Sequence, residues 1–156
     1  MSWELTILIN VLFSGIASVA FAIMINVPHR TLWICGLSGI IGWMVYWFLY
    51  QAHFGMTLSN LLGTLFVGLF GNVFARVKKC PVTVFNIPGI VPLVPGVPAY
   101  EAIRAMVSGQ LNTAIGLLLR VAIVTGAITI GFMFAQLGHE LWLRFKKVYK
   151  KHLKPL

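Results

Sequence analysis

Four apolar runs, each long enough to cross a lipid bilayer as a helix, constrain this chain more than any other feature. They cover residues 5–25, 31–50, 57–75 and 113–138, and about 20 apolar residues are enough to span the hydrocarbon core as an α-helix. Only 10% of the residues are charged, whereas about a quarter are charged in a typical soluble domain. Tryptophan and tyrosine, which favour the headgroup level, stand near the ends of the runs: Trp3, Trp33, Trp43, Tyr46, Trp47, Tyr50 and Trp142. The sequence therefore predicts an all-α, polytopic membrane bundle that forms a single transmembrane domain over residues 1–156.

The first run also contains "AFA" at residues 20–22, which resembles a signal-peptide cleavage site. No Lys or Arg precedes the run, and its apolar character continues past that site to Ile25. Both features differ from those of a signal peptide. We therefore expect the run to be retained as the first membrane span.

Small residues recur at helical spacing within three of the runs and predict faces on which neighbouring helices pack closely. The predicted faces are Ser14, Ser18 and Ala22 in the first run, Ser38 and Gly42 in the second, and Ala127, Gly131 and Ala135 in the last.

A fifth uncharged run, residues 80–100, is long enough to span a membrane but contains Pro88, Pro92, Pro95 and Pro98. An interior proline lacks an N–H and clashes with the carbonyl group four residues earlier. The run therefore predicts a fourth span that is broken, with free carbonyl groups at Val84, Pro88, Val91 and Val94. Unsatisfied backbone groups are costly in lipid, so this span must be surrounded by other helices or line a watery cavity.

The basic residues support the prediction that this run crosses the membrane. If it does, ten of the twelve Lys and Arg residues fall on one side, as the positive-inside rule requires of the cytoplasmic side. That side carries Arg30, Arg76, Lys78, Lys79, Arg144, Lys146, Lys147, Lys150, Lys151 and Lys154. We expect the N-terminus outside the cell and the C-terminus in the cytoplasm, with residues 139–156 as a basic tail that binds the inner membrane surface.

Interrupted spans form solute sites in many secondary transporters, so the proline-rich run is the candidate substrate path. The alternative is a structural kink or re-entrant loop that binds no ligand. Arg120, inside the last run, either pairs with a substrate carboxylate or extends its guanidinium to the membrane surface. Glu101 either closes the outer mouth of the path or forms a solvent-exposed pair with Arg104. The candidate path residues are Asn86, Pro88, Gly89, Pro92, Pro95, Gly96, Tyr100, Glu101 and Arg120.

The sequence argues against catalysis and against a bound cofactor. It contains no Asp, its acidic residues are Glu4, Glu101 and Glu140, and it lacks the hydrolase and metalloprotease motifs. Cys35 and Cys80 stand alone, and the four histidines lack metal-ligand spacing. We expect no cofactor, no metal and no nucleic-acid partner.

Two short motifs point to a known family. An NVP-x-R motif comprises Asn26, Val27, Pro28 and Arg30, and a P-x-x-PG-x-x-AY motif comprises Pro92, Pro95, Gly96, Ala99 and Tyr100. With these motifs and this order of spans, the chain resembles the threonine/serine exporter family, and within it the YjjB-like small subunit. The resemblance implies an exporter in the bacterial cytoplasmic (inner) membrane for small amino acids or small carboxylates. It also implies ion coupling and a second, larger membrane subunit.

The leading hypothesis is therefore one subunit of a secondary exporter, with membrane lipids, a larger subunit and a small-molecule substrate as partners. Two alternatives are an accessory subunit that stabilises a partner without transporting anything, and an exporter built from several copies of this chain.

Overall fold

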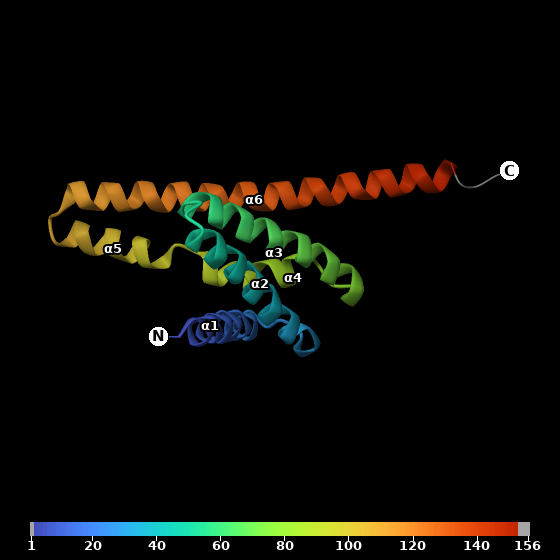
Figure 1. The fold of residues 1–156 in the computed structure, drawn as a ribbon, viewed down its shortest axis with the longest axis horizontal. Helices are drawn as coiled ribbons and strands as arrows, with labels where there is room; N and C mark the ends of the chain where they lie inside the picture. Colours follow the sequence, from blue (N-terminus) through green and yellow to red (C-terminus); the bar gives the residue numbers. More distant parts are fainter. Residues whose placement is uncertain (1, 153–156) are drawn as a thin grey trace.

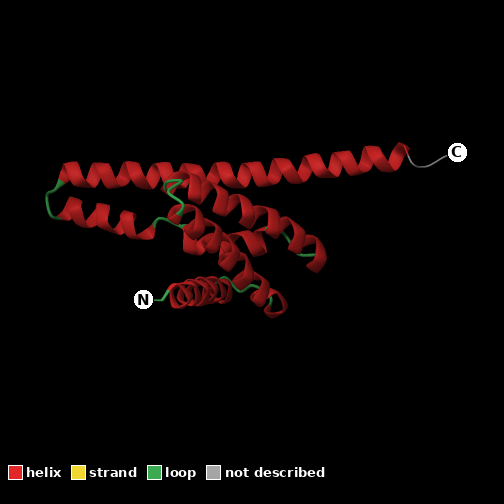
Figure 2. Cartoon of the chain, viewed as in Figure 1, coloured by secondary structure: helices red, strands yellow, loops and turns green. Residues whose placement is uncertain are grey.

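The computed structural model describes residues 2–152, and this part of the chain is helical, without a β-strand (Figure 2). The six α-helices are α1 (Trp3–Met24), α2 (Leu32–Gln51), α3 (Met56–Lys78), α4 (Thr83–Ile90), α5 (Gly96–Val107) and α6 (Leu111–His152). Two single turns of 3₁₀ helix, η1 (His29–Thr31) and η2 (Val91–Leu93), precede α2 and follow α4.

The structure confirms a helical membrane bundle. Helices α1, α2, α3 and α6 are each long and apolar enough to cross a bilayer, in agreement with the four predicted runs. Segments Thr83–Leu93 and Gly96–Val107 qualify together as a fifth span, with a bend of 55° between them. The sequence predicted a broken span over residues 80–100, and the bend falls within that run. The two segments form either one broken span, which is the predicted arrangement, or a re-entrant loop.

The helices pack in layers, with α1 on one side of the bundle, α6 on the other, and α2, α3 and α4 between them (Figure 1). Glycines set the spacing between layers. A Cβ atom at Gly39 would collide with Ser18 of α1, and one at Gly131 of α6 would lie 2.5 Å from the backbone oxygen of Leu61 in α3. The predicted small-residue faces are buried at these contacts, so that prediction is confirmed.

Helix α6 is the longest helix in the described part of the chain and runs parallel to α3. Gly131 lies against Thr64, and one turn further on Gly68 lies against Ala135. These two contacts align α3 with α6 so that the start of α3 is level with Ile123 of α6. Residues 111–122 therefore extend about 18 Å beyond α3, at a rise of about 1.5 Å per residue. Helix α5 folds back along this extension, and we call the two together the α5–α6 arm (Figure 1).

The other end of α6 extends past the predicted span. The sequence predicted a span ending at residue 138, followed by a basic tail at the inner membrane surface, and in the structure α6 continues without a break to His152. The segment after Gly138 has no proline before Pro155 and no helix-stop signal. Residues 153–156, which include Lys154, lie outside the described part of the chain.

The NVP-x-R motif forms the turn between α1 and α2. Asn26 adopts a left-handed conformation with φ of 60°. Its N–H donates to the carbonyl oxygen of Ile23, and the N–H of Val27 donates to that of Ala22. This pair of hydrogen bonds is a Schellman motif, and the contact between buried Val27 and Ala22 completes it. Pro28 then prevents the helix from continuing, so the motif ends α1.

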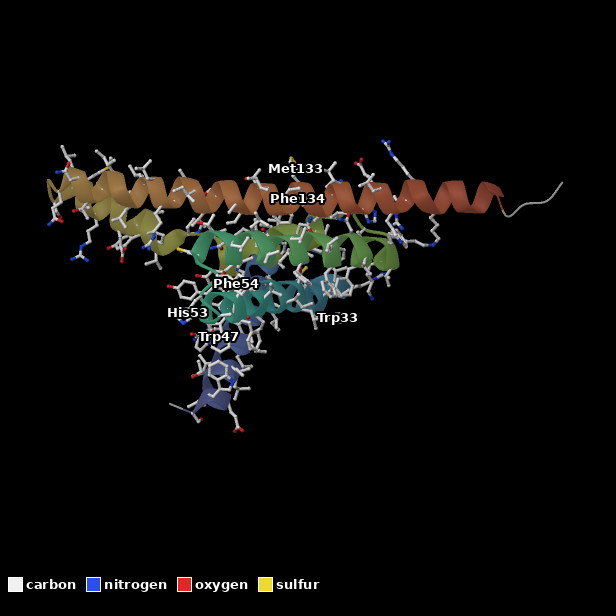
Figure 3. The ribbon with its side chains drawn as sticks, turned by 45° about the horizontal axis from the view of Figure 1, so that its top comes forward. Trp33, Trp47, His53, Phe54, Met133 and Phe134 are labelled. Carbon is white, nitrogen blue, oxygen red and sulfur yellow. The ribbon has the colours of Figure 1, made fainter. Side chains whose placement is uncertain are left out.

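Aromatic and basic side chains mark the two ends of the bundle. At one end, the Nζ of Lys78 lies 5.6 Å from the centre of the Trp33 ring, while Arg76 and Lys146 both stack on Trp142. Near the opposite end of α2, the rings of Trp3 and Trp47 lie 4.9 Å apart. Figure 3 shows Trp33 and Trp47 well separated along α2, with His53 in the loop beyond Trp47. We call these the basic end and the aromatic end.

Candidate functional site

The broken span joins the two ends of the bundle. It starts after α3 at the basic end and reaches α6 through the loop at residues 108–110, beyond the aromatic end (Figure 1). Helix α4 packs against α1, α2 and α3, so the first half of the segment is enclosed by other helices. Phe85, Pro88, Gly89 and Leu93 are buried there.

The prolines disrupt this segment less than expected. Pro88 lies inside α4 and not at a break, and Pro98 occupies the third position of α5, where an N–H would have no acceptor within the helix. The break itself falls at Val94 and Pro95, between η2 and α5.

The prediction of free carbonyl groups is wrong for three of the four positions. The thiol of Cys35 donates to the carbonyl oxygen of Val84 over 3.3 Å. The N–H of Val91 donates to Pro88, and that of Gly96 donates to Val94 over 2.8 Å. A side chain from another helix and two tight turns thus satisfy groups that the prolines leave open, which removes most of the predicted carbonyl lining.

The two glycines that follow prolines have different surroundings. A Cβ atom at Gly89 would lie 2.5 Å from the Oγ of Ser38 and 2.8 Å from Cγ1 of Val67, so α4 approaches both α2 and α3 closely here. A Cβ atom at Gly96 would meet nothing within 4 Å. Neighbouring helices therefore approach closely at Gly89 and not at Gly96.

A cavity of about 160 Å³ lies between α3, α4 and α6. It is lined by Gly68, Asn72, Asn86, Phe132, Ala135 and Gln136, and we call it the carboxamide cavity. Asn72 is only 3% exposed, and its Nδ2 donates to the carbonyl oxygen of Gly68 over 2.9 Å. The Oδ1 of Asn86 is buried next to Gly71 and has no hydrogen-bond partner.

A second cavity, of about 270 Å³, lies between α1, α2 and η2, near the aromatic end. Pro92 and Asn10 both line it. The Oδ1 of Asn10 accepts a hydrogen bond of 2.7 Å from the indole nitrogen of Trp43, and its Nδ2 donates to the carbonyl oxygen of Thr6. Because both ends of this amide have partners, the cavity offers less free hydrogen-bonding capacity than the carboxamide cavity.

The structure divides the predicted path residues into two groups. Asn86, Pro88, Gly89, Pro92 and Pro95 lie within the bundle, buried or half-buried. The second group is exposed and lies on the α5–α6 arm: Gly96, Tyr100, Glu101 and Arg120. Two separate regions thus replace the single path that the sequence suggested.

Sequence reasoning missed Gln136. For Asn72 it favours hydrogen bonding between helices, with a polar lining of the path as the alternative. Both are polar residues inside long apolar runs, and that signal marks them for closer attention. Within the described residues, no group of three His, Cys, Asp or Glu side chains could hold a metal ion.

Comparison with known proteins agrees with these features. No solved structure matches the chain. A family model described as "Threonine/Serine exporter, ThrE" matches residues 10–137, which include the small-residue faces, the broken span and both cavities. The chain therefore belongs to the threonine/serine exporter family, a family of membrane transporters.

Proposed function

We propose that this chain is one subunit of a secondary exporter that moves small amino acids or small carboxylates out of the cell. The observation that carries the proposal is a broken span held inside the bundle of a chain from an exporter family. Helix breaks near the middle of the membrane are where many secondary transporters bind their solutes. On this proposal, α4 and η2 border the solute path, and the α5–α6 arm lies toward its outer mouth.

The distribution of charge supports an N-terminus outside the cell and a C-terminus in the cytoplasm of a bacterial cell. The basic end gathers Arg76 and Lys78 of α3 and Lys146 of α6 around Trp33 and Trp142. Cytoplasmic segments carry the excess of Lys and Arg in membrane proteins. The exposed position of Arg120 on the arm supports the alternative in which its guanidinium reaches the outer membrane surface.

The arm also supports assembly with another membrane subunit. Val97, Val107 and Leu119 on it are 70%, 85% and 59% exposed. A larger subunit of the same family, or a second copy of this chain, would cover these side chains.

The test of the proposal measures transport and assembly in the same membranes. Inverted membrane vesicles would be prepared from cells that express the chain together with a larger member of the same family. Uptake of radiolabelled L-threonine and of malonate would be measured, and recovery of the assembled complex would be quantified in parallel. We expect uptake of at least one of the two probes.

The variants compare prolines in two settings. A double Pro92→Ala, Pro95→Ala variant alters the break, whereas Pro81→Ala alters an exposed proline outside the helices and serves as the control. Lost uptake with intact assembly in the double variant supports the transport role. Lost assembly in that variant supports the accessory-subunit alternative, and no uptake by the unmodified complex contradicts export.

A further inference from the structure

The carboxamide cavity lies close to the middle of the bundle. Its α6 residues are level with the central part of α3, because Ala135 lies against Gly68. Solute sites of secondary transporters lie near the membrane midplane, next to interrupted helices. Asn86, in the interrupted segment, supplies one wall of this cavity.

The cavity has hydrogen-bonding capacity that the protein does not use. The Oδ1 of Asn86 is packed against α3 at Gly71, closed to solvent and without a partner, so the carboxamide nitrogen is the polar group that Asn86 can offer to the cavity. The Nδ2 of Asn72 is engaged with Gly68, which leaves the Oδ1 of Asn72 as an acceptor. Gln136 adds an exposed carboxamide within an apolar stretch of α6.

The described residues that line the cavity offer donors and acceptors but no charge. A carboxamide group both donates and accepts hydrogen bonds. An ion with net charge would lose its hydration here without a counter-charge, which is much more costly than burying a hydrogen-bonded neutral group. The chemistry of the lining therefore favours a solute whose charges sum to zero over an anion.

Glycines keep the cavity open and limit its size. A Cβ atom at Gly71 would collide with the amide of Asn86, and one at Gly68 would lie 2.5 Å from Cβ of Ala135. The volume of about 160 Å³ corresponds to roughly five water molecules at about 30 Å³ each. A compact polar solute has this volume.

We propose that Asn72, Asn86 and Gln136 form the binding site for a small polar solute of zero net charge. This inference rests on the proposed transport function and assigns it a location. The solute donates a hydrogen bond to the Oδ1 of Asn72 and accepts hydrogen bonds from the carboxamide nitrogens of Asn86 and Gln136. The broken span takes part through the side chain of Asn86, and not through the free carbonyl groups that the prolines suggested.

A matched pair of asparagines on α3 tests the assignment. Asn60 and Asn72 are both buried, and each donates its Nδ2 to the carbonyl oxygen four residues earlier. Only Asn72 lines the cavity. We expect Asn72→Ala and Asn86→Ala to lower L-threonine uptake by inverted vesicles about tenfold, as the loss of one buried hydrogen bond implies. Asn60→Ala should change uptake less than about twofold at equal protein level.

The charge preference has its own prediction. Uptake of L-threonine by the unmodified complex should exceed that of malonate, and Asn86→Asp, which keeps the size of the side chain and adds a negative charge, should lower malonate uptake further. Uptake of malonate equal to that of L-threonine would contradict the zero-charge assignment.

A binding measurement separates this inference from the proposed function. Phe132→Cys, at a position that lines the cavity but is not one of the three proposed binding residues, would be introduced after Cys35→Ser and Cys80→Ser. Its labelling by a small maleimide would be followed with and without L-threonine at about 10 mM. Protection by L-threonine, absent when Asn72→Ala is added, supports the site even if vesicles show no transport. The site is overturned if the unmodified complex transports L-threonine, L-threonine gives no protection from labelling, and Asn72→Ala and Asn86→Ala leave uptake unchanged. The exporter function would stand in that case.

Discussion

At the scale of single residues, the contact between Cys35 and Val84 explains how α4 accommodates a proline. Pro88 cannot donate to the carbonyl oxygen of Val84, and the buried thiol of Cys35 donates to it instead. A cysteine that stands alone in the sequence thus has a specific partner 49 positions away.

Substitution of Cys35 should therefore depend on the hydrogen bond and not only on size. We expect Cys35→Ala to lower the free energy of unfolding by about 1 kcal/mol, because the Val84 carbonyl loses its donor. Cys35→Ser keeps a donor and should remain closer to the unmodified protein. Unfolding in a graded detergent mixture would measure both. Equal losses for Ala and Ser would indicate that packing, and not the hydrogen bond, stabilises this contact.

Asn26 provides a second prediction at this scale. Its φ of 60° is readily adopted by glycine and strongly disfavoured for a β-branched residue. We expect Asn26→Gly to leave the thermal midpoint in detergent nearly unchanged, whereas Asn26→Val should destabilise the protein by about 1–2 kcal/mol. A midpoint for Asn26→Val equal to that of Asn26→Gly would show that the turn between α1 and α2 tolerates another conformation.

At the scale of helices, glycine contacts set the distance between α3 and α6. A Cβ atom at Gly131 would meet backbone atoms of Leu61 and Leu65, which cannot rotate away, whereas Gly126 on the same helix has nothing within 4 Å of such an atom. We expect Gly131→Ala to destabilise the protein by about 1–3 kcal/mol through overpacking. Gly126→Ala should be neutral or slightly stabilising, because alanine favours the helix. Thermal unfolding of the two variants would provide the comparison, and equal midpoints would contradict the close α3–α6 contact.

The predictions from sequence succeeded where they depended on local pattern. Apolar length predicted four spans, and helical spacing of small residues predicted the faces that are buried, such as Ser14, Ser18 and Ala22. They were wrong where the outcome depends on contacts between distant segments. The Val84 carbonyl is satisfied from α2, and the neighbourhood of Asn72 and Asn86 arises only when α4 packs on α3. Neither contact leaves a periodic signal in the sequence.

At the scale of the whole molecule, the two ends of the bundle differ in charge, and this difference predicts its orientation. Single cysteines would be introduced at Ser2, Gln51 and Lys79 after Cys35→Ser and Cys80→Ser. We expect a membrane-impermeant maleimide added to intact spheroplasts to label positions 2 and 51 but not 79, which should react only after the membrane is opened. The reverse pattern would contradict an external N-terminus and the proposed direction of the fourth span.

The glycine contacts also have a consequence for motion. Helices α1 and α2 are in close contact at Gly39, and α3 and α6 are in close contact at Gly131, because neither position has room for a methyl group. We therefore expect the two helices of each pair to move together. The carboxamide cavity lies where α4 meets the α3–α6 pair, so a rocking of one pair against the other would open and close it while leaving both pairs intact.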